Sequence, residues 1–283
     1  MPPASPPTPP IVLAFAASDP TGGAGVQADI LTLAALGCHP ASVITALTVQ
    51  DTAGVEGVQA VEAGWVADQA RALLEDVPVA AFKLGLLGSI EAISAIAEVV
   101  SDYPDVPLVL DPVLASGRGD QLADDESIAA IIELLLPQTT VLTPNSLEAR
   151  RLAFDEENDA DRPSLSECAR RLIDGGCEYV LVTGTHENTA EVVNVLYGGR
   201  GAVRSDKWPR LAGSFHGSGC TLASAIAAHL AFGLEVEQAI RDAQEYTWRT
   251  LAAGFRPGMG QHIPDRFFWA REDAEPAAEG GNG

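Results

Sequence analysis

Short runs of apolar residues alternate along this chain with longer segments in which apolar positions recur every three or four residues. The first pattern is typical of buried strands, and the second is typical of helices that cover a sheet. We expect strands at Ile11–Ala17, Ser42–Val49, Ala80–Leu84, Leu108–Leu110, Val141–Leu142 and Tyr179–Val182. We expect helices at Gly25–Leu36, Trp65–Leu74, Ser89–Val100, Ser127–Leu136, Ser146–Ala153, Ser164–Asp174, Thr221–Phe232 and Val236–Ala253. Because the two kinds of element alternate, the sequence predicts an α/β fold with a mostly parallel sheet.

The segment after Val182 departs from this alternation. Two strand-like runs, Glu191–Tyr197 and Ala202–Ser205, flank the glycine-rich sequence 198–201, which is the signal of a β-hairpin. The hairpin predicts an antiparallel edge on the otherwise parallel sheet. Among the helices, the segment 65–74 has a clear apolar stripe that we expect to be one buried face. Its members are Trp65, Val66, Ala70, Leu73 and Leu74.

A single domain is expected to span residues 11–270, because no linker or internal repeat interrupts them. The proline-rich residues 1–10 are expected to form a disordered tail. The acidic residues 271–283 are expected to form a second disordered tail. The acid-rich segment Asp155–Pro163 is expected to be an exposed loop.

The charge balance limits the partners of this protein. Of its 283 residues 47% are hydrophobic, and 17 Lys and Arg residues stand against 39 Asp and Glu residues, for a net charge of −22. Such a field repels nucleic-acid backbones and anionic membranes, so we expect neither as a partner. A small anionic substrate remains compatible with it, because local hydrogen-bond donors can hold a phosphate.

Targeting and covalent cross-linking are not expected. Residues 1–10 lack the basic start of a signal peptide, and the apolar segment Thr221–Leu234 is shorter than the ~20 residues that cross a bilayer. The four cysteines show no paired C-x-x-C spacing. We therefore expect a cytoplasmic protein without disulfides or structural zinc.

The strongest local motif is the sequence His216-Gly-Ser-Gly-Cys-Thr221 before an apolar helix. Glycines let several backbone amides face one point, and the helix dipole adds positive potential, so the segment can stabilise charge on a phosphoryl group. Cys220 lies at the helix N-terminus, which lowers a thiol pKa and favours a thiolate base. The alternative is an ordinary glycine turn with a small buried cysteine.

A second glycine motif follows the first predicted strand. Gly23-x-Gly25-x-x-Ala28 fits the dinucleotide fingerprint, with Asp51 at a distance suited to ribose binding. This pattern keeps open a nicotinamide-dependent oxidoreductase. Five residues separate Ala17 from Gly23, however, where the fingerprint requires a tight turn.

Carboxylates follow two further predicted strands. Asn145 and Glu148 are three residues apart at a helix start, so both side chains can reach one face near the sheet edge. They could hold Mg²⁺ through water, because this cation prefers oxygen ligands and retains its hydration. The alternative is a helix cap. Asp111, directly after a predicted strand, is either a turn residue or part of the same site.

Taken together, these blocks resemble the hydroxymethylpyrimidine/phosphomethylpyrimidine kinases of thiamine synthesis. The matching segments, spread over about residues 11–254, are 18–29, 43–50, 83–85, 110–113, 142–148 and 216–221. The family belongs to the ribokinase-like superfamily, so the resemblance implies a three-layer α/β/α sandwich that binds ATP and Mg²⁺. It also implies pyridoxal kinases as relatives of the same fold.

The resemblance implies a role for each matching position. Pyrimidine contacts fall on Asp29, Gln50, Ala17 and Leu86, magnesium on Asn145 and Glu148, ATP and phosphate on Asp111, Thr183, Ser218 and Thr221, and catalysis on Gly217, Gly219 and Cys220. Ala17 and Leu86 replace the family's usual glycine and methionine. Thr183-Gly-Thr185 replaces the usual Lys-Gly-Gly, which removes a positive charge and makes phosphorylation of a monophosphate less secure than phosphorylation of the alcohol.

We therefore expect a homodimeric, ATP- and magnesium-dependent kinase of 4-amino-5-hydroxymethyl-2-methylpyrimidine, with the monophosphate as a second candidate substrate. A pyridoxal kinase is the alternative within the fold. An oxidoreductase and a non-catalytic binding protein are the alternatives from other classes.

Overall fold

The computed structural model describes residues 8–115, 119, 121–154 and 163–272, and they form one nine-stranded sheet with the order β3-β2-β1-β4-β5-β6-β7-β8-β9. Its parallel strands are β1 (Ile11–Ser18), β2 (His39–Gln50), β4 (Val79–Leu84), β5 (Leu108–Leu110), β6 (Val141–Leu142) and β7 (Tyr179–Val182). The antiparallel strands are β3 (Val55–Ala60) at one edge and the hairpin β8 (Glu191–Gly198) and β9 (Gly201–Pro209) at the other. The expected hairpin edge is confirmed, and a second antiparallel edge is added.

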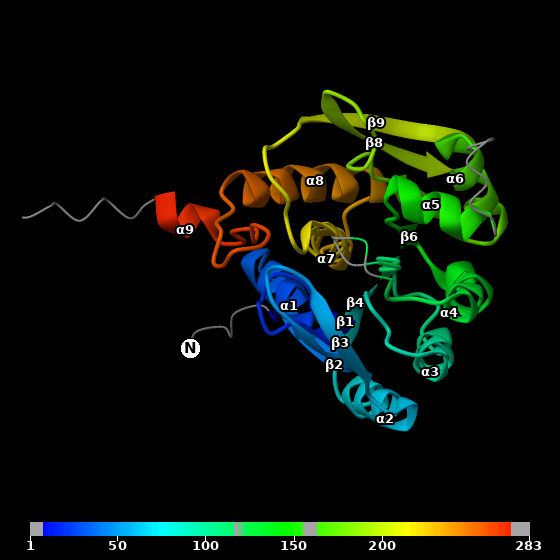
Figure 1. Ribbon diagram of the computed structural model, residues 1–283. Helices are drawn as coiled ribbons and strands as arrows, with labels where there is room; N and C mark the ends of the chain where they lie inside the picture. The colour runs from blue at the N-terminus through cyan, green and yellow to red at the C-terminus, as the bar shows by residue number, and fades with distance from the viewer. Residues whose placement is uncertain (1–7, 116–118, 120, 155–162, 273–283) are drawn as a thin grey trace, which may run out of the picture.

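Helices cover both faces of the sheet and make three layers (Figure 1). One face packs against α1 (Gly25–Ala35), α7 (Ser218–Ala231) and α8 (Val236–Ala252). The other packs against α2 (Ala63–Leu74), α3 (Ile90–Ser101), α4 (Asp125–Ala130), α5 (Ser146–Ala153) and α6 (Leu165–Asp174). Successive side chains of β1 point to opposite faces of the sheet. Val12 therefore packs in the core under α1, α7 and α8, and Leu13 and Phe15 pack in the core under α2 to α6.

The predicted helices are present with shifts of a few residues at their ends, except for the one expected at 127–136. There α4 continues into a π-helical turn, Ile131–Leu135, and a short 3₁₀ turn, Leu136–Gln138. A short last helix, α9 (Phe268–Glu272), was not expected and extends past residue 270, where we expected the domain to end.

The predicted buried stripe of α2 is partly wrong. Val66 and Ala70 are fully buried, but Trp65 is 67% exposed, and Leu73 and Leu74 are half-buried. Successive helical residues are ~100° apart, so the pair spaced by four residues defines the face toward the sheet and Trp65 lies beside it. A large apolar residue next to a buried helix face is therefore not necessarily buried itself.

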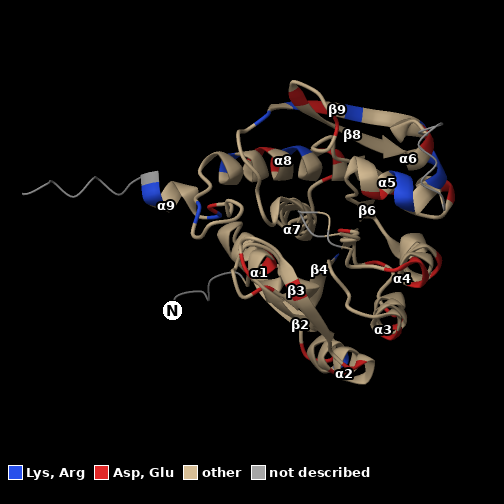
Figure 2. Cartoon of the chain, in the orientation of Figure 1, with Lys and Arg blue, Asp and Glu red and all other residues tan. Residues whose placement is uncertain are grey.

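The expected tails and the acidic loop fall largely outside the described residues, which omit 1–7, 155–162 and 273–283. Within the described part, the carbonyl of Pro10 already accepts a hydrogen bond from the amide of His39. Acidic residues are spread over the outer helices, and basic residues lie on β9, α5, α6, α8 and α9 (Figure 2). No helix in the described ranges has the length and apolar content that crossing a membrane would require.

Candidate active site

A cavity of about 340 Å³ lies beyond the carboxyl ends of the parallel strands, which is where open α/β sheets bind ligands. Its walls bring together most of the predicted site residues, although they come from distant parts of the chain. The predicted residues that line it are Ala17, Gln50, Leu86, Asp111, Asn145, Glu148, Thr183, Gly217, Ser218, Gly219 and Cys220. Two predicted residues, Asp29 and Thr221, are not among its lining residues.

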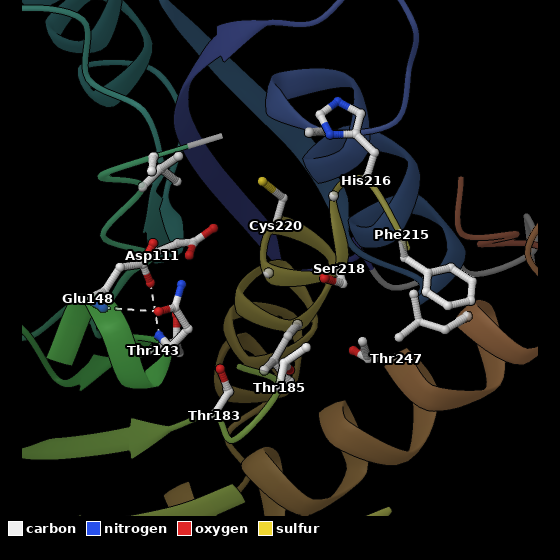
Figure 3. A pocket seen from close by; sticks show the side chains of 18 of the residues that line it. Asp111, Thr143, Glu148, Thr183, Thr185, Phe215, His216, Ser218, Cys220 and Thr247 are labelled. Carbon is white, nitrogen blue, oxygen red and sulfur yellow. Dashed lines mark hydrogen bonds between the residues drawn. The ribbon is translucent and has the colours of Figure 1, made fainter. Parts of the chain in front are cut away.

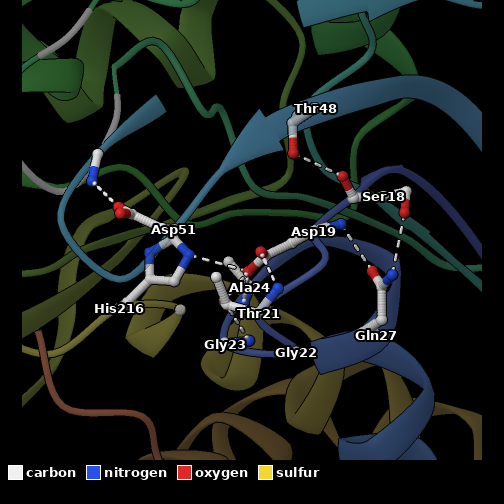
Figure 4. Close-up of polar contacts among 12 residues, drawn as sticks. Ser18, Asp19, Thr21, Gly22, Gly23, Ala24, Gln27, Thr48, Asp51 and His216 are labelled. Carbon is white, nitrogen blue, oxygen red and sulfur yellow. Dashed lines mark hydrogen bonds and ion pairs between the residues drawn. The ribbon is translucent and has the colours of Figure 1, made fainter. Parts of the chain in front are cut away.

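The loop after β1 is organised by Asp19, whose side chain is 1% exposed. Its carboxylate accepts hydrogen bonds from the amide and hydroxyl of Thr21 and from the amide of Ala24. It also lies 2.9 Å from Nε2 of His216, which belongs to the loop before α7 (Figure 4). One buried carboxylate therefore joins the two glycine-rich loops. The sequence reasoning missed this pair, because the two residues are 197 positions apart.

The turn before α7 has a shape that glycine makes possible. Gly217 has a φ of 81° and caps the helix that begins at Ser218. A side chain on Gly217 would overlap the carbonyl of Gly23, so the two loops touch through their backbones. Ser218 and Cys220 then lie on the cavity wall at the helix start (Figure 3). This arrangement fits the predicted anion-binding turn.

The expected thiolate at Cys220 is not what the structure supports. Burial raises the pKa of the thiol to about 12; the ammonium of Lys83 opposes this effect, and the carboxylates of Asp111 and Asp29 add to it. The helix N-terminus that we expected to lower the pKa is outweighed by desolvation and by these negative neighbours. The thiol is thus protonated at neutral pH.

A buried ion pair lies behind the cavity wall. Nζ of Lys83 is 2.9 Å from Oδ1 and 3.0 Å from Oδ2 of Asp29, and both side chains are fully buried. Asp29 also accepts a hydrogen bond from the hydroxyl of Ser224 on α7. Asp29 therefore meets Lys83, which itself lines the cavity, rather than the cavity directly. The sequence block containing Lys83 was recognised, but its partner could not be read from the sequence.

Asn145 and Glu148 form a helix cap and also face the cavity. The side chain of Asn145 accepts from the amides of Leu147 and Glu148, while the carboxylate of Glu148 accepts from the amide of Asn145 at 2.9 Å. The capping alternative is thus confirmed. Burial, reinforced by the charge of Asp111, raises the pKa of Glu148 to about 8.

Asp111 is the second carboxylate of this corner, and it is buried. Burial raises its pKa to about 6. The charge of Lys83 and a hydrogen bond with the Cys220 thiol oppose that rise, and the charge of Asp29 adds to it. Its Oδ2 atom is buried and has no hydrogen-bond partner among the described residues. Two carboxylates in this position fit a divalent cation, which would add to the single positive charge of Lys83 beside them. No group of three or more His, Cys, Asp or Glu side chains in the described ranges forms a protein-only metal cluster.

The other end of the cavity is lined by residues that the sequence reasoning did not select. They are Arg210, Leu211, Phe215, Thr247, Trp248 and Leu251. The predicted residue Thr183 and its neighbour Thr185 lie on the same part of the wall as Phe215 and Thr247 (Figure 3). The hydroxyl of Thr247 is buried and lacks a partner among the described residues. An apolar wall with one unsatisfied hydroxyl suits a flat heteroaromatic ring. The spacing of 247, 248 and 251 on one helix face was the signal available in the sequence.

Arg210 fixes the loop that carries Thr183 and Thr185. Its guanidinium donates three hydrogen bonds of 2.9 to 3.0 Å, to the carbonyls of Thr185, Glu187 and Thr189. The carbonyls of every second residue in this loop thereby accept from one planar guanidinium group. The loop conformation at this end of the cavity depends on that side chain.

Two sequence interpretations need correction. Thr221 is fully buried; its hydroxyl donates to the carbonyl of Gly217 and accepts from Arg266, so it braces the turn instead of contacting a ligand. Asp51 caps its own turn by accepting from the amides of Ala53 and Gly54 and does not line the cavity. The dinucleotide interpretation thereby loses its ribose-binding carboxylate.

Comparisons with known proteins agree with this geometry. A family model described as phosphomethylpyrimidine kinase matches residues 19–265. The chain is 39% identical over 265 residues to the hydroxymethylpyrimidine/phosphomethylpyrimidine kinase of Streptomyces coelicolor, with 91% of this chain and 94% of that protein covered. It is 40% identical over 262 residues to the thiamine biosynthesis bifunctional protein ThiED of Geobacter sulfurreducens, covering 93% of this chain but only 53% of that longer protein.

Solved structures place the fold in the same group. A Bacillus subtilis pyridoxal kinase in an ADP complex matches with a TM-score of 0.83 and 26% identity, covering 93% of this chain and 100% of that one. The phosphomethylpyrimidine kinase of Clostridium difficile matches with a TM-score of 0.71 and 33% identity, covering 84% and 97%. The fold and the site thus define a small-molecule kinase of the ribokinase-like class. Within that class, the chain belongs to the phosphomethylpyrimidine kinase family.

Proposed function

We propose that this protein transfers the terminal phosphoryl group of ATP to the hydroxymethyl group of 4-amino-5-hydroxymethyl-2-methylpyrimidine, a step of thiamine biosynthesis. The observation that carries the proposal is a single cavity whose wall holds Gln50 at one place and the glycine turn 217–220 at another. The first offers hydrogen bonds to a polar ring, and the second offers amides to a phosphate. Membership of the kinase family supports the same assignment.

The pyrimidine end is assigned to Ala17, Gln50 and Leu86. The amide of Gln50 presents a donor and an acceptor, which matches the edge of an aminopyrimidine that presents both. Ala17 and Leu86 supply apolar contacts to the ring faces. Asp29 acts indirectly, by pairing with Lys83, which is a fully buried residue of the cavity wall.

The phosphoryl end is assigned to the turn of Gly217, Ser218, Gly219 and Cys220. Phosphoryl transfer asks mainly for positioning and charge stabilisation, which backbone amides at a helix start provide. Glu148 and Asn145 would hold Mg²⁺, with the unpartnered oxygen of Asp111 facing it. The cation would neutralise charge on the phosphates when bound.

Cys220 is proposed as the group that accepts the proton of the substrate hydroxyl. Its thiol is protonated at neutral pH, so its own proton must first leave. Asp111 is the available acceptor, since it shares a hydrogen bond with the thiol and its pKa of about 6 keeps it largely ionised at neutral pH. Because the thiol is not ionised in advance, we place its contribution at the low end for a general base, about 100-fold.

The nucleotide end is assigned to the wall of Leu211, Phe215, Thr247 and Leu251, with Thr183 and Thr185 toward the phosphates. Thr183 brings a hydroxyl and no charge. A substrate that already carries a phosphate therefore meets less positive charge here than a lysine would supply. We propose that the alcohol is the better substrate and the monophosphate the poorer one.

Pyridoxal is the second candidate substrate, favoured by the structural match to a pyridoxal kinase at 26% identity. The carbonyl group of pyridoxal and the amino group of the pyrimidine differ in hydrogen-bond character, so one side-chain amide cannot serve both equally. The pyrimidine is the first choice, because the relatives named for it are 39% identical over most of the chain.

We also propose that the protein is a cytoplasmic homodimer. Exposed apolar side chains lie on β2, β3 and the first turn of α2, and they are Leu47, Val49, Val58 and Trp65. Such side chains at a sheet edge are a candidate for burial by a second copy. Sedimentation of the wild type against Leu47→Glu tests this assignment, and a wild-type monomer would contradict it.

The test of the function is ADP release with ATP and, in separate reactions, the pyrimidine alcohol, its monophosphate and pyridoxal. We expect the order alcohol, monophosphate, pyridoxal in kcat/KM. ADP release that depends on none of them would refute the proposed function.

A further inference from the structure

A buried arginine lies behind the anion-binding turn. Arg266 precedes α9 and is 3% exposed. Its guanidinium donates to the carbonyl of Gly22 at 3.2 Å, to the carbonyl of Gly23 at 2.5 Å and to the hydroxyl of Thr221 at 3.0 and 3.2 Å. Every one of these partners is uncharged.

No carboxylate forms an ion pair with Arg266 in the part of the chain that the structure describes. Arginine stays protonated in proteins, so the site holds a full buried charge. The carboxylates of Asp29 and Asp19 attract this charge only through space, without direct contact. The groups that contact it are polar, uncharged groups of two separate segments, and they offset part of the cost of burying it.

Those two segments meet at the phosphoryl end of the cavity. Thr221 follows Cys220 directly, and its hydroxyl donates to the carbonyl of Gly217 at 2.8 Å. Gly217 in turn packs against the backbone of Gly23 so closely that a Cβ would not fit. One guanidinium thus connects the glycine loop after β1 with the first turn of α7. Its own backbone is held by Tyr246, whose hydroxyl donates to the Arg266 carbonyl at 3.0 Å.

We propose that Arg266 is a positioning residue for phosphoryl transfer, which locks the loop at Gly22 and Gly23 onto the turn at Gly217 and sets a positive charge behind its amides. In a buried site such a charge acts with little screening, so it adds to the helix dipole where negative charge gathers on the transferred group. This inference rests on the proposed kinase function. It assigns the segment 255–270 a part in the reaction that its sequence did not reveal.

The test compares Arg266→Gln, Arg266→Lys and Thr221→Val with the wild type. Arg266→Gln removes the charge and most donors, and Arg266→Lys keeps the charge without the planar fork. Thr221→Val keeps the charge and the shape but removes the bridging hydroxyl. We expect kcat to fall about 100-fold, tenfold and tenfold respectively, with the KM for the pyrimidine changed less than about twofold. Arg170→Gln, an exposed arginine paired with Asp174 on α6, is the control for loss of one charge.

A second readout does not need turnover. Calorimetry should show that Arg266→Gln weakens a non-hydrolysable ATP analogue about tenfold while ADP binds as in the wild type, because the effect is confined to the terminal phosphate. If Arg266→Gln does not fold, as judged by circular dichroism, Thr221→Val decides the question. A folded variant with kcat within twofold of the wild type, or equal weakening of both nucleotides, would overturn the inference. A wild type that phosphorylates no pyrimidine would refute the proposed function instead, and the nucleotide comparison would still judge Arg266.

Discussion

Nε2 of His216 lies 2.9 Å from Oδ2 of Asp19, so a side chain from the loop before α7 closes onto the loop after β1 (Figure 4). Burial opposes ionisation of Asp19, but the hydrogen bonds from His216, Ala24 and Thr21 outweigh it and lower its pKa from the ordinary value of 3.8. The ionised carboxylate therefore contributes stability above that value, and this contribution is lost as the pH falls through the folded-state pKa.

Asp19→Asn tests this contact. The amide keeps one oxygen acceptor but loses the charge that satisfies four donors, so we expect a loss of about 1–3 kcal/mol at pH 7. Urea unfolding between pH 3 and pH 7 should show that the difference from the wild type shrinks on acidification. Asp124→Asn, at the exposed N-cap of α4, is the control. An unchanged difference at all pH values would show that the charge of Asp19 adds no stability.

Gln50→Leu tests the pyrimidine end. Removing the amide leaves the ring edge without its donor and acceptor, which costs ~1–3 kcal/mol per unpaired group and should raise the pyrimidine KM at least about fivefold. The KM for ATP should stay within about twofold, because Gln50 belongs to β2 and is not part of the proposed nucleotide wall. Gln59→Leu, on the exposed strand β3, is the matched control. A normal pyrimidine KM in Gln50→Leu would remove this residue from the site.

Glu148→Gln tests the magnesium assignment. Glutamine can also complete a capping box, so α5 should keep its start. The concentration of Mg²⁺ that gives half-maximal turnover should rise about tenfold or more, because one anionic ligand is lost. The control is Glu167→Gln, which alters the equivalent exposed capping box of α6. A normal Mg²⁺ titration in Glu148→Gln would leave this residue a purely structural role.

Arg210→Ala tests the loop that carries Thr183 and Thr185. Three loop carbonyls lose their common hydrogen-bond donor, so the loop at the nucleotide end of the cavity should become less ordered. Ordering it again on binding costs free energy, and the KM for ATP should rise about tenfold. The KM for the pyrimidine should change little. Arg200→Ala, in the exposed β8–β9 turn, removes the same charge. Equal effects of the two substitutions would mean that charge alone matters.

Cys220→Ala tests the proton acceptor. We expect kcat to fall about 100-fold with little change in pyrimidine binding, and Cys220→Asp to retain more activity, since a carboxylate also accepts a proton. Alkylation by iodoacetamide should accelerate up to and beyond pH 10, in line with a thiol pKa of about 12. Near-normal turnover in Cys220→Ala would assign catalysis to the backbone amides alone.

The layered fold could be predicted because it follows from local patterns. Continuous apolar runs such as Val12 to Ala17 have few options other than a buried strand, and Gly198 to Gly201 signals a hairpin. Strand β3 escaped prediction because none of its residues is buried and its sequence does not alternate regularly between apolar and polar residues. Trp65 shows the converse, since a hydrophobic side chain at a helix start was wrongly counted as core.

The site was only partly predictable, because its chemistry depends on distant partners. Gln50 could be located because it follows a predicted strand, and Cys220 could be located because it follows a glycine turn. The pairing of Asp29 with Lys83 could not be predicted. It explains why Asp29 is buried behind the cavity wall and does not line the cavity. The thiol pKa was predicted in the wrong direction, because the helix dipole is visible in the sequence whereas burial beside Asp111 is not.

The central claim is that the hydroxymethyl oxygen of the pyrimidine receives the phosphoryl group of ATP. The most direct measurement is the phosphorus NMR spectrum of the product formed from ATP and the pyrimidine alcohol. We predict a monoester resonance that is coupled to the two methylene protons of the substrate and grows as ADP forms. An unmodified pyrimidine after ADP release, or no reaction with the alcohol under conditions where pyridoxal is phosphorylated, would contradict the account.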